Sequence, residues 1–351
     1  MRTTGYVCNF ASLLERKEDL RKKRLLEIYS SLSKHQQTRK VYSGEFWMEA
    51  TKIFNGREMP LVNSGYVKEL DLLSKAVVPQ LGSDGTVWRH FGLSNTHHST
   101  SIEGNTFSER DIEVLFDSFG SYSAEQLTEM SQQDFRAVLQ PDVSKRECRE
   151  VLYHLKAFQL ISTLKQLPLS DFNETELVNL HAILLGKKEK ERWNVVGFME
   201  STYRLTPMRV RGSATVRPYP QEVPAIMKSY FEWFHSNREK VDSGAIHPVS
   251  FSILAHCKFL HIHPFHDGNG RTARLLMNMI LNRYGLFGIT VHKESRAEYM
   301  ELLEEHQQGN VEPQFFGFAD HTNYPGNECK TKSKLTLKLC FSYCPVGILQ
   351  L

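Results

Sequence analysis

Apolar residues recur along most of the chain at the spacing of one helix face. Residues 174–185 are an example, because Leu177, Leu180 and Leu184 follow one another at intervals of three and four, which is the period of an α-helix. Ser108-Glu-Arg-Asp111 has the form of a capping box, which begins a helix. We therefore expect a mainly α-helical protein, with helices over residues 11–35, 67–78, 87–100, 111–119, 147–164, 174–185, 223–235, 249–260, 270–281 and 296–306.

The pattern changes between Trp193 and Pro220, where short apolar runs alternate with turn residues. Runs such as Tyr203-Arg-Leu205 are typical of short strands. This stretch therefore predicts a small β-hairpin on an otherwise helical fold.

The stretch His263-Pro-Phe-His-Asp-Gly-Asn-Gly-Arg-Thr-Ala-Arg274 concentrates the chemistry of the chain. Gly268-Asn269-Gly270 can adopt positive φ, which turns consecutive backbone N–H groups toward one point. The helix that follows adds the positive end of its dipole there. Arg271 and Arg274 are three residues apart, so both lie on one helix face and can bind phosphate oxygens. We interpret this stretch as a polyphosphate site.

Two further groups in the same stretch can supply catalysis. Asp267 is a hard oxygen ligand beside the expected phosphates, which suits Mg²⁺. His263 lies just upstream and can accept a proton near neutral pH, as a general base must. Phe265, between them, is expected to point into the core and anchor the loop.

A zinc site is an alternative use of the same histidines. His261, His263 and His266 with Asp267 provide four ligand types that zinc accepts, but a zinc site needs its ligands to converge on a tetrahedron. Two nearby arginines would repel the cation. We therefore favour the phosphate site, and we expect His97 and His98 on the surface and His256 in the core.

The twelve residues resemble the Fic-domain signature H-x-F-x-[DE]-G-N-G-R-x-x-R at every specified position. The resemblance covers roughly residues 87–320. It implies a Fic-type helical bundle with a β-hairpin flap, which would clamp a target segment. It also implies the family's usual reaction, transfer of AMP from ATP to a Ser, Thr or Tyr hydroxyl of a target protein.

The resemblance also implies a role for each matching position. His263 would deprotonate the target hydroxyl, and Asp267 would hold Mg²⁺. The α- and β-phosphates would be bound by Gly268, Asn269, Gly270 and Arg271, and the γ-phosphate by Arg274. Tyr299 and Gln307 lie where family members contact adenosine; Gln307 stands where animal proteins commonly have asparagine.

A second motif, Ser99-x-x-x-Glu103-Gly104, is similar to the family's inhibitory motif [ST]-x-x-x-E-[GN]. A carboxylate in the last turn of a helix opposes the helix dipole, so Glu103 is unusually placed. By resemblance, Glu103 would pair with Arg274 where the γ-phosphate belongs. This is the arrangement in which the inhibitory helix, here near residues 94–104, precedes the catalytic core.

The resemblance divides the chain into three regions. Residues 1–86 form an N-terminal helical region of unknown role, residues 87–320 the catalytic domain, and residues 321–351 an atypical tail. Residues 120–146 are longer than the corresponding connection in animal proteins, which predicts an insertion.

The composition of the chain limits the kinds of binding partner that we expect. A net charge of +3 is too small to indicate a nucleic acid or an anionic membrane as partner. No apolar run reaches the ~18 residues of a membrane span, and we find no signal sequence, so we expect a cytoplasmic or nuclear protein. Six sparse cysteines are typical of reduced thiols.

We therefore predict a Mg²⁺- and ATP-dependent protein adenylyltransferase, autoinhibited by Glu103, that modifies an unidentified target protein. Removal of AMP by the same site and a homodimer are left open. The alternatives are transfer of UMP or phosphocholine on the same scaffold, and a catalytically silent interaction protein.

Overall fold

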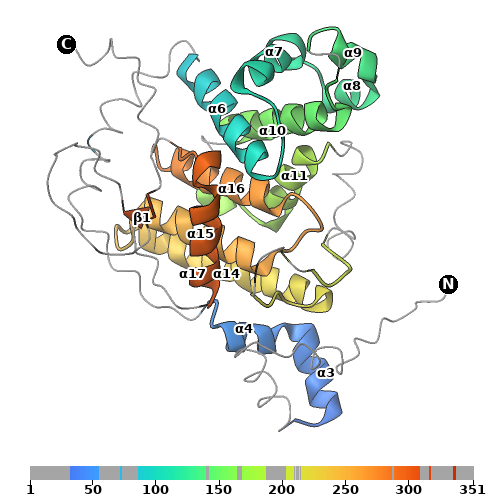
Figure 1. The fold of residues 1–351 in the computed structure, drawn as a ribbon. Coiled ribbons are helices and arrows are strands. Elements are labelled where there is room, and N and C mark those ends of the chain that lie inside the picture. The colour runs from blue at the N-terminus through green and yellow to red at the C-terminus, as the bar shows by residue number, and fades with distance from the viewer. Residues whose placement is uncertain are drawn as a thin grey trace, which may run out of the picture.

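The computed structural model describes residues 32–54, 72, 86–139, 142–163, 168–186, 203–208, 210, 213, 215–286, 288–308, 316–317 and 335–336. This part is mainly α-helical (Figure 1), as predicted. Its α-helices are α3 (Lys34–Ser43), α4 (Glu45–Thr51), α6 (Thr86–Ile102), α7 (Glu109–Phe119), α8 (Ala124–Glu129), α9 (Gln132–Arg136), α10 (Lys145–Thr163), α11 (Glu174–Leu184), α14 (Val223–Asp242), α15 (Pro248–Ile262), α16 (Asn269–Arg283) and α17 (Arg296–Gln308).

Short elements complete the described part. Single turns of 3-10 helix are η3 (Leu169–Asp171), η5 (Pro220–Glu222) and η6 (Lys293–Ser295). The strands β1 (Phe316–Gly317) and β2 (Leu335–Thr336) pair in parallel, with Phe316 opposite Leu335. None of the described helices is both long and apolar enough to cross a bilayer.

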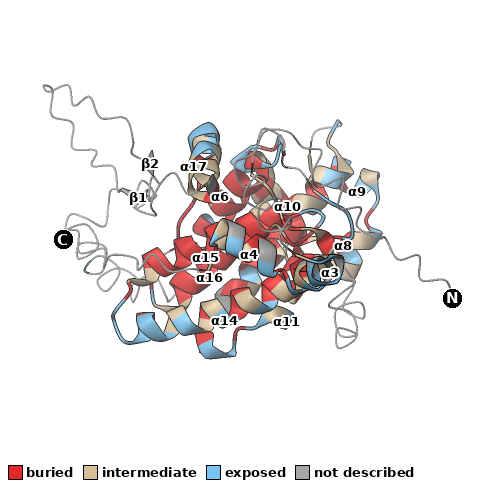
Figure 2. Ribbon diagram, turned by 90° about the horizontal axis from the view of Figure 1, so that it is seen from below, coloured by how far each residue is buried: buried red, intermediate tan, exposed pale blue. Residues whose placement is uncertain are grey.

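Helices α15 and α16 pack against each other at the centre of the molecule. Nearly all their residues are buried, as Figure 2 shows by the red of both helices. Helix α15 is apolar around most of its circumference, which is typical of a helix inside a fold, whereas α16 also buries polar residues such as Arg274 and Asn278. The start of α16 lies beside α6 and α10, which supply polar partners to the site.

The predicted insertion, residues 120–146, contains α8 and α9. With α7, part of α10 and part of α6 these short helices enclose a second apolar core, separate from the main one, that includes Phe119, Leu127 and Phe135. Capping boxes begin α7 at Ser108, as predicted, and α8 at Ser123. Residues 120–146 therefore have a structural role at the end of the molecule that carries α7 to α10 (Figure 1).

Part of the N-terminal region packs on the main core. Trp47 on α4 is buried and its indole N–H donates to the Val216 carbonyl at 3.0 Å. The same ring meets the imidazole of His261 edge to face, with centroids 5.0 Å apart. Residues of α4 thus support the end of α15 that leads into the 263–274 stretch.

Some predicted elements differ from the structure, and others concern residues that the structure does not describe. Helix α14 continues to Asp242 rather than ending near His235. Tyr203 to Leu205 is not a strand but a bend, because the Arg204 N–H donates to Pro264 rather than to a strand partner. Residues 206–208, 210, 213 and 215–220 of the predicted hairpin are described and contain no strand. The remainder of the hairpin, nearly all of the helix over 67–78, most of 11–35 and most of the tail lie outside the described residues.

Candidate functional site

The site begins at the end of α15, where the backbone turns sharply. His263 caps this helix with φ 54° and ψ 59°, a left-handed conformation that is uncommon for a residue with a side chain. Arg204 holds the turn: its Nε donates to the His263 carbonyl at 2.8 Å and its backbone N–H to the Pro264 carbonyl at 2.9 Å. Such strain persists only where the surroundings fix it, and a buried guanidinium does so here.

The loop from Pro264 to Gly268 is closed by one side chain. The Asn269 amide accepts the Phe265 N–H at 3.0 Å and donates to the Phe265 carbonyl at 2.8 Å. Phe265 is fully buried, as predicted, and stacks on the His181 ring with centroids 3.6 Å apart. His181 Nε2 also lies 2.9 Å from the Asp267 carbonyl oxygen. The loop is therefore fixed before any ligand binds.

We expect Asn269→Ala to destabilise the fold by about 2–6 kcal/mol, because it leaves a buried N–H and a buried C=O of Phe265 without partners, each costing about 1–3 kcal/mol. Urea unfolding measures this. Asn237→Ala is the control: Asn237 donates to the Trp233 carbonyl inside α14, a carbonyl that the helix ladder already satisfies. Equal losses in the two variants would contradict a special role for Asn269.

The start of α16 presents the backbone N–H groups of a first helical turn, in which Gly268 and Asn269 are buried and Gly270 is half-buried. Gly268 is the N-cap with φ 77°, whereas Asn269 and Gly270 already belong to the first helical turn. Positive φ is thus confined to Gly268, and the predicted anion site is made by the helix start itself. Asp267 precedes it with an exposed carboxylate, whose Oδ1 accepts the Gly268 N–H at 2.7 Å.

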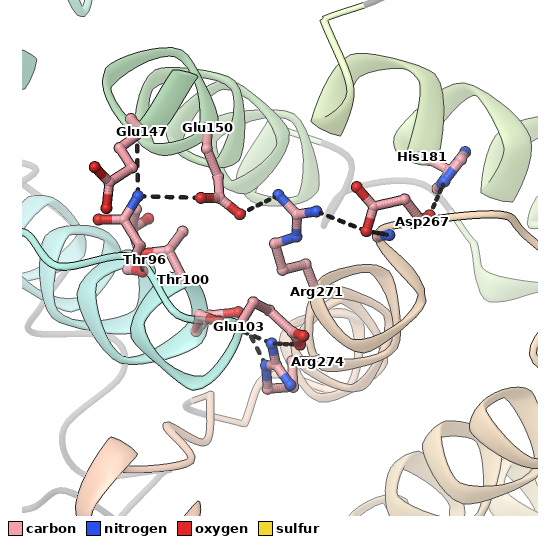
Figure 3. Close-up of polar contacts among 12 residues, drawn as sticks. Thr96, Thr100, Glu103, Glu147, Glu150, His181, Asp267, Arg271 and Arg274 are labelled. Atoms are coloured by element: carbon pink, nitrogen blue, oxygen red, sulfur yellow. Dashed lines mark hydrogen bonds and ion pairs between the residues drawn. The ribbon is translucent and has the colours of Figure 1, made fainter. Parts of the chain in front are cut away.

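A carboxylate of the protein occupies this helix start (Figure 3). Glu103, just after α6, places Oε1 2.8 Å from the Arg274 guanidinium, and so close to Gly270 that a Cβ there would overlap it. Arg274 is buried and also donates to the Ser99 hydroxyl and carbonyl, both at 2.9 Å. Ser99 and Glu103, the two polar residues that define the second motif, therefore both contact Arg274, the second arginine of the 263–274 stretch.

Burial lowers the pKa of Arg274, but the Glu103 carboxylate beside it keeps that pKa above the ordinary value of an arginine. The guanidinium is therefore always charged. An anion must remain beside it, and in this structure Glu103 is that anion.

Arg271 has a different partner, which the sequence did not reveal. Glu150 on α10 accepts from Arg271 at 2.5 Å, and its second oxygen accepts the Asn105 amide at 3.1 Å (Figure 3). Asp267 lies 3.4 Å from the same guanidinium. Glu150 therefore connects the loop after Glu103 to Arg271. No local motif marks it, because it is one polar residue in a long helix.

The His263 imidazole is partly buried. Its Nδ1 has no hydrogen-bond partner. Burial and the nearby Arg217 and Arg204 lower the pKa of His263 to about 3. The ring is therefore neutral at pH 7, which a proton acceptor requires.

The two residues expected near adenosine are both buried. Tyr299 on α17 places its hydroxyl 2.8 Å from His256 Nε2, and Gln307 is 4% exposed. His256 lies in the core, as predicted. Tyr299 also interacts with Arg274, so the structure brings it to the arginine rather than to an open surface.

The histidines of the zinc alternative do not converge. His261 packs on Trp47, and His266 is exposed at the loop. The expectation that His97 and His98 lie on the surface is wrong: both are buried, 4% and 7% exposed, because this part of α6 is covered by neighbouring elements.

Comparison with known proteins places this site in a family context. Residues 171–281 match the model of the Fic/DOC family. The protein adenylyltransferase Fic of Drosophila grimshawi is 29% identical over 230 residues, 66% of this chain and 41% of that protein. The Drosophila sechellia protein of the same name is 25% identical over 309 residues, 84% of this chain and 56% of that protein. The chain thus spans about half the length of these relatives.

Solved structures resemble the fold. A Fic domain containing signaling protein from Bacteroides thetaiotaomicron superimposes with a TM-score of 0.52 and 27% identity, covering 68% of this chain and 81% of that one. Fic-1 from C. elegans superimposes with the same TM-score at 22% identity, over 70% of this chain and 65% of that one. The chain therefore contains a Fic/DOC domain on a mainly α-helical Fic-like fold, and it is related to the animal protein adenylyltransferases Fic at 25 to 29% identity.

Proposed function

We propose that the protein is a protein adenylyltransferase that moves AMP from ATP to a hydroxyl side chain of a target protein, and that Glu103 inhibits it. The observation that carries the proposal is the Glu103 carboxylate at the start of α16, paired with Arg274. An internal anion at that point indicates a site built for an external one. The name of the Drosophila relatives supports the same reaction.

Displacement of Glu103 would free the groups that bind the triphosphate. Arg274 would take the γ-phosphate, and Arg271 with the N–H groups of Gly268, Asn269 and Gly270 would take the α- and β-phosphates. The Asn269 side chain already bonds to Phe265, so residue 269 would contribute through its backbone. Tyr299 and Gln307 would contact the nucleoside after α17 adjusts.

Asp267 fits Mg²⁺, because its carboxylate is 62% exposed beside the helix start and one oxygen is already oriented by Gly268. When bound there with the nucleotide, the ion would neutralise phosphate charge. His263 would accept the proton of the target hydroxyl. The hydroxyl oxygen would bond to the α-phosphorus as the bond from that phosphorus to the bridging oxygen breaks, releasing pyrophosphate.

The reverse process belongs to the same proposal. Glu103 is 37% exposed, so its carboxylate can contact water as well as Arg274. The oxygen of a water oriented there would bond to the phosphorus of a modified target as the bond from that phosphorus to the target oxygen breaks. A proton from the water would pass to the target oxygen, and AMP would be released. Residues 87–320 would form the catalytic domain, with the 94–104 segment as its inhibitory element.

Product mass identifies the transferred group. The Glu103→Gly chain is incubated with Mg²⁺ and an equimolar mixture of ATP, UTP and CDP-choline, and intact mass and modified peptides are measured. We expect the mass added to be that of AMP less water, on a hydroxyl side chain. A dominant UMP or phosphocholine adduct would replace the proposed substrate, and no adduct on itself or added proteins would favour a silent interaction protein.

A further inference from the structure

A second cluster of chemically active side chains lies where α6 meets η6. His98 on α6, with His292 and Glu294 at η6, brings one metal-ligand atom from each residue within 4.8 Å of the others. Glu294 Oε2 is 3.9 Å from the Nδ1 atoms of both histidines, and the two imidazole centroids are 4.3 Å apart. No other such group was found in the part of the chain that the structure describes.

We propose that His98, His292 and Glu294 bind a divalent transition-metal ion, Zn²⁺ in the first instance, which ties α6 to the segment before α17. Two imidazole nitrogens and a carboxylate oxygen are a donor set that zinc accepts, with water as the fourth ligand. Tetrahedral N and O ligands lie about 3.4 Å apart, so the Glu294 oxygen, now 3.9 Å from each imidazole nitrogen, needs to approach them by about half an ångström. Glu294 is 64% exposed and can make that movement.

The surroundings of His98 match those of a metal ligand. Its other ring nitrogen, Nε2, lies 3.8 Å from the Glu109 carboxylate, and that carboxylate accepts the Ser94 hydroxyl at 3.1 Å. A carboxylate on the second nitrogen orients a metal-binding histidine. The Lys293 N–H now donates to His98 Nδ1 at a long 3.3 Å, a bond the ion would replace. The carboxylates of Glu109 and Glu294 offset the positive charge of Lys293, which would otherwise repel a metal cation.

An ion at this point would stabilise the docked position of α6. Helix α6 ends at Ile102, directly before Glu103, and Arg296 Nε already donates to the Ile102 carbonyl at 2.8 Å. The metal would add a second tie on the same side and so hold Glu103 against Arg274. This consequence rests on the proposed function, whereas metal binding itself does not.

Metal binding is measured without activity. Metal is removed from the full chain with a chelator, and the protein is then titrated with Zn²⁺ in competition with a zinc-sensitive dye. The variants compared with wild type are His292→Gln, Glu109→Gln and the control His90→Gln, which lies on the exposed face of α6. We expect one equivalent of Zn²⁺ to bind at least about 100-fold more weakly in His292→Gln, and about 10-fold more weakly in Glu109→Gln, as for an outer partner. His90→Gln should match wild type.

Co²⁺ separates this site from the cysteines. Bound through N and O atoms it should give visible d–d bands without a thiolate charge-transfer band, and His292→Gln should abolish them. Equal Zn²⁺ affinity in His292→Gln and wild type, or a thiolate spectrum in both, would overturn the proposal.

A separate arm tests the consequence for activity. Zn²⁺ should lower AMP transfer by wild type but not by His292→Gln. In Glu103→Gly it should bind unchanged and leave transfer unaltered. Binding without inhibition in wild type would refute only the regulatory role, and absence of transfer in every variant would count against the proposed function instead.

Discussion

Glu103→Gly is expected to raise incorporation of AMP from ATP labelled in the α-phosphate by about 10- to 100-fold. The variant removes a charge-assisted hydrogen bond to the buried Arg274, and such a bond contributes about 1.5–3 kcal/mol. It also clears the space over Gly270. The γ-phosphate then meets a guanidinium that keeps its bonds to Ser99 but no longer has a carboxylate beside it. Auto-modification followed over time, at fixed Mg²⁺ and ATP, is the measurement.

A matched control distinguishes this effect from a general loosening of the fold. Glu129 is also an exposed carboxylate at the end of a short helix, α8, but it lies far from the start of α16. Glu129→Gly should leave labelling unchanged. Tighter ATP binding by Glu103→Gly, seen as a larger thermal shift with Mg-ATP, should accompany the rise. Equal labelling by wild type and Glu103→Gly would rule out the inhibitory assignment.

His263→Ala in the Glu103→Gly background is expected to lower AMP transfer by about 10²–10⁴-fold, the contribution of a positioned general base. The change should appear in the rate and not in ATP binding, because the proposed phosphate contacts come from the start of α16 and not from His263. Single-turnover labelling at saturating ATP measures the rate, and a thermal shift measures binding.

Two control variants distinguish loss of the base from loss of the fold. His263 has a left-handed backbone that asparagine tolerates better than alanine, so His263→Asn should lose activity while keeping the melting temperature. His266→Ala, at an exposed position in the same loop, should keep activity. Activity comparable to the background in His263→Asn would remove the base assignment.

Most of the helices could be predicted because the spacing of apolar residues and the capping residues are read from short stretches of sequence. The period of apolar residues placed α11 within one residue of its observed end, and the Ser108 capping box placed the start of α7. Where tertiary contacts decide, the sequence was a weaker guide. Tyr203 to Leu205 has strand composition, but Arg204 bonds to the 263–264 turn instead.

The candidate site was predictable as far as its residues are contiguous. Residues 263–274 form one continuous motif, so its residue types were enough to predict a phosphate site. Glu103 was found because it belongs to a second short motif. Glu150 and His181 come from separate helices and have no flanking pattern, so only the fold brings them to Arg271 and Asp267. The burial of His98 likewise depends on segments distant in sequence.

The partners of Arg271 and Arg274 set the limits of any fragment intended for expression. The family match starts at residue 171, yet Ser99, Glu103 and Glu150 all precede it. Cutting the gene at the match would remove Glu103 from Arg274 and Glu150 from Arg271, leaving Arg271 only the more distant Asp267. Breaking a buried ion pair by removing one partner costs about 3–5 kcal/mol, against a total stability of about 5–15 kcal/mol for a typical domain. With Trp47 also packed beneath α15, the shortest piece that keeps its interior intact starts ahead of α3.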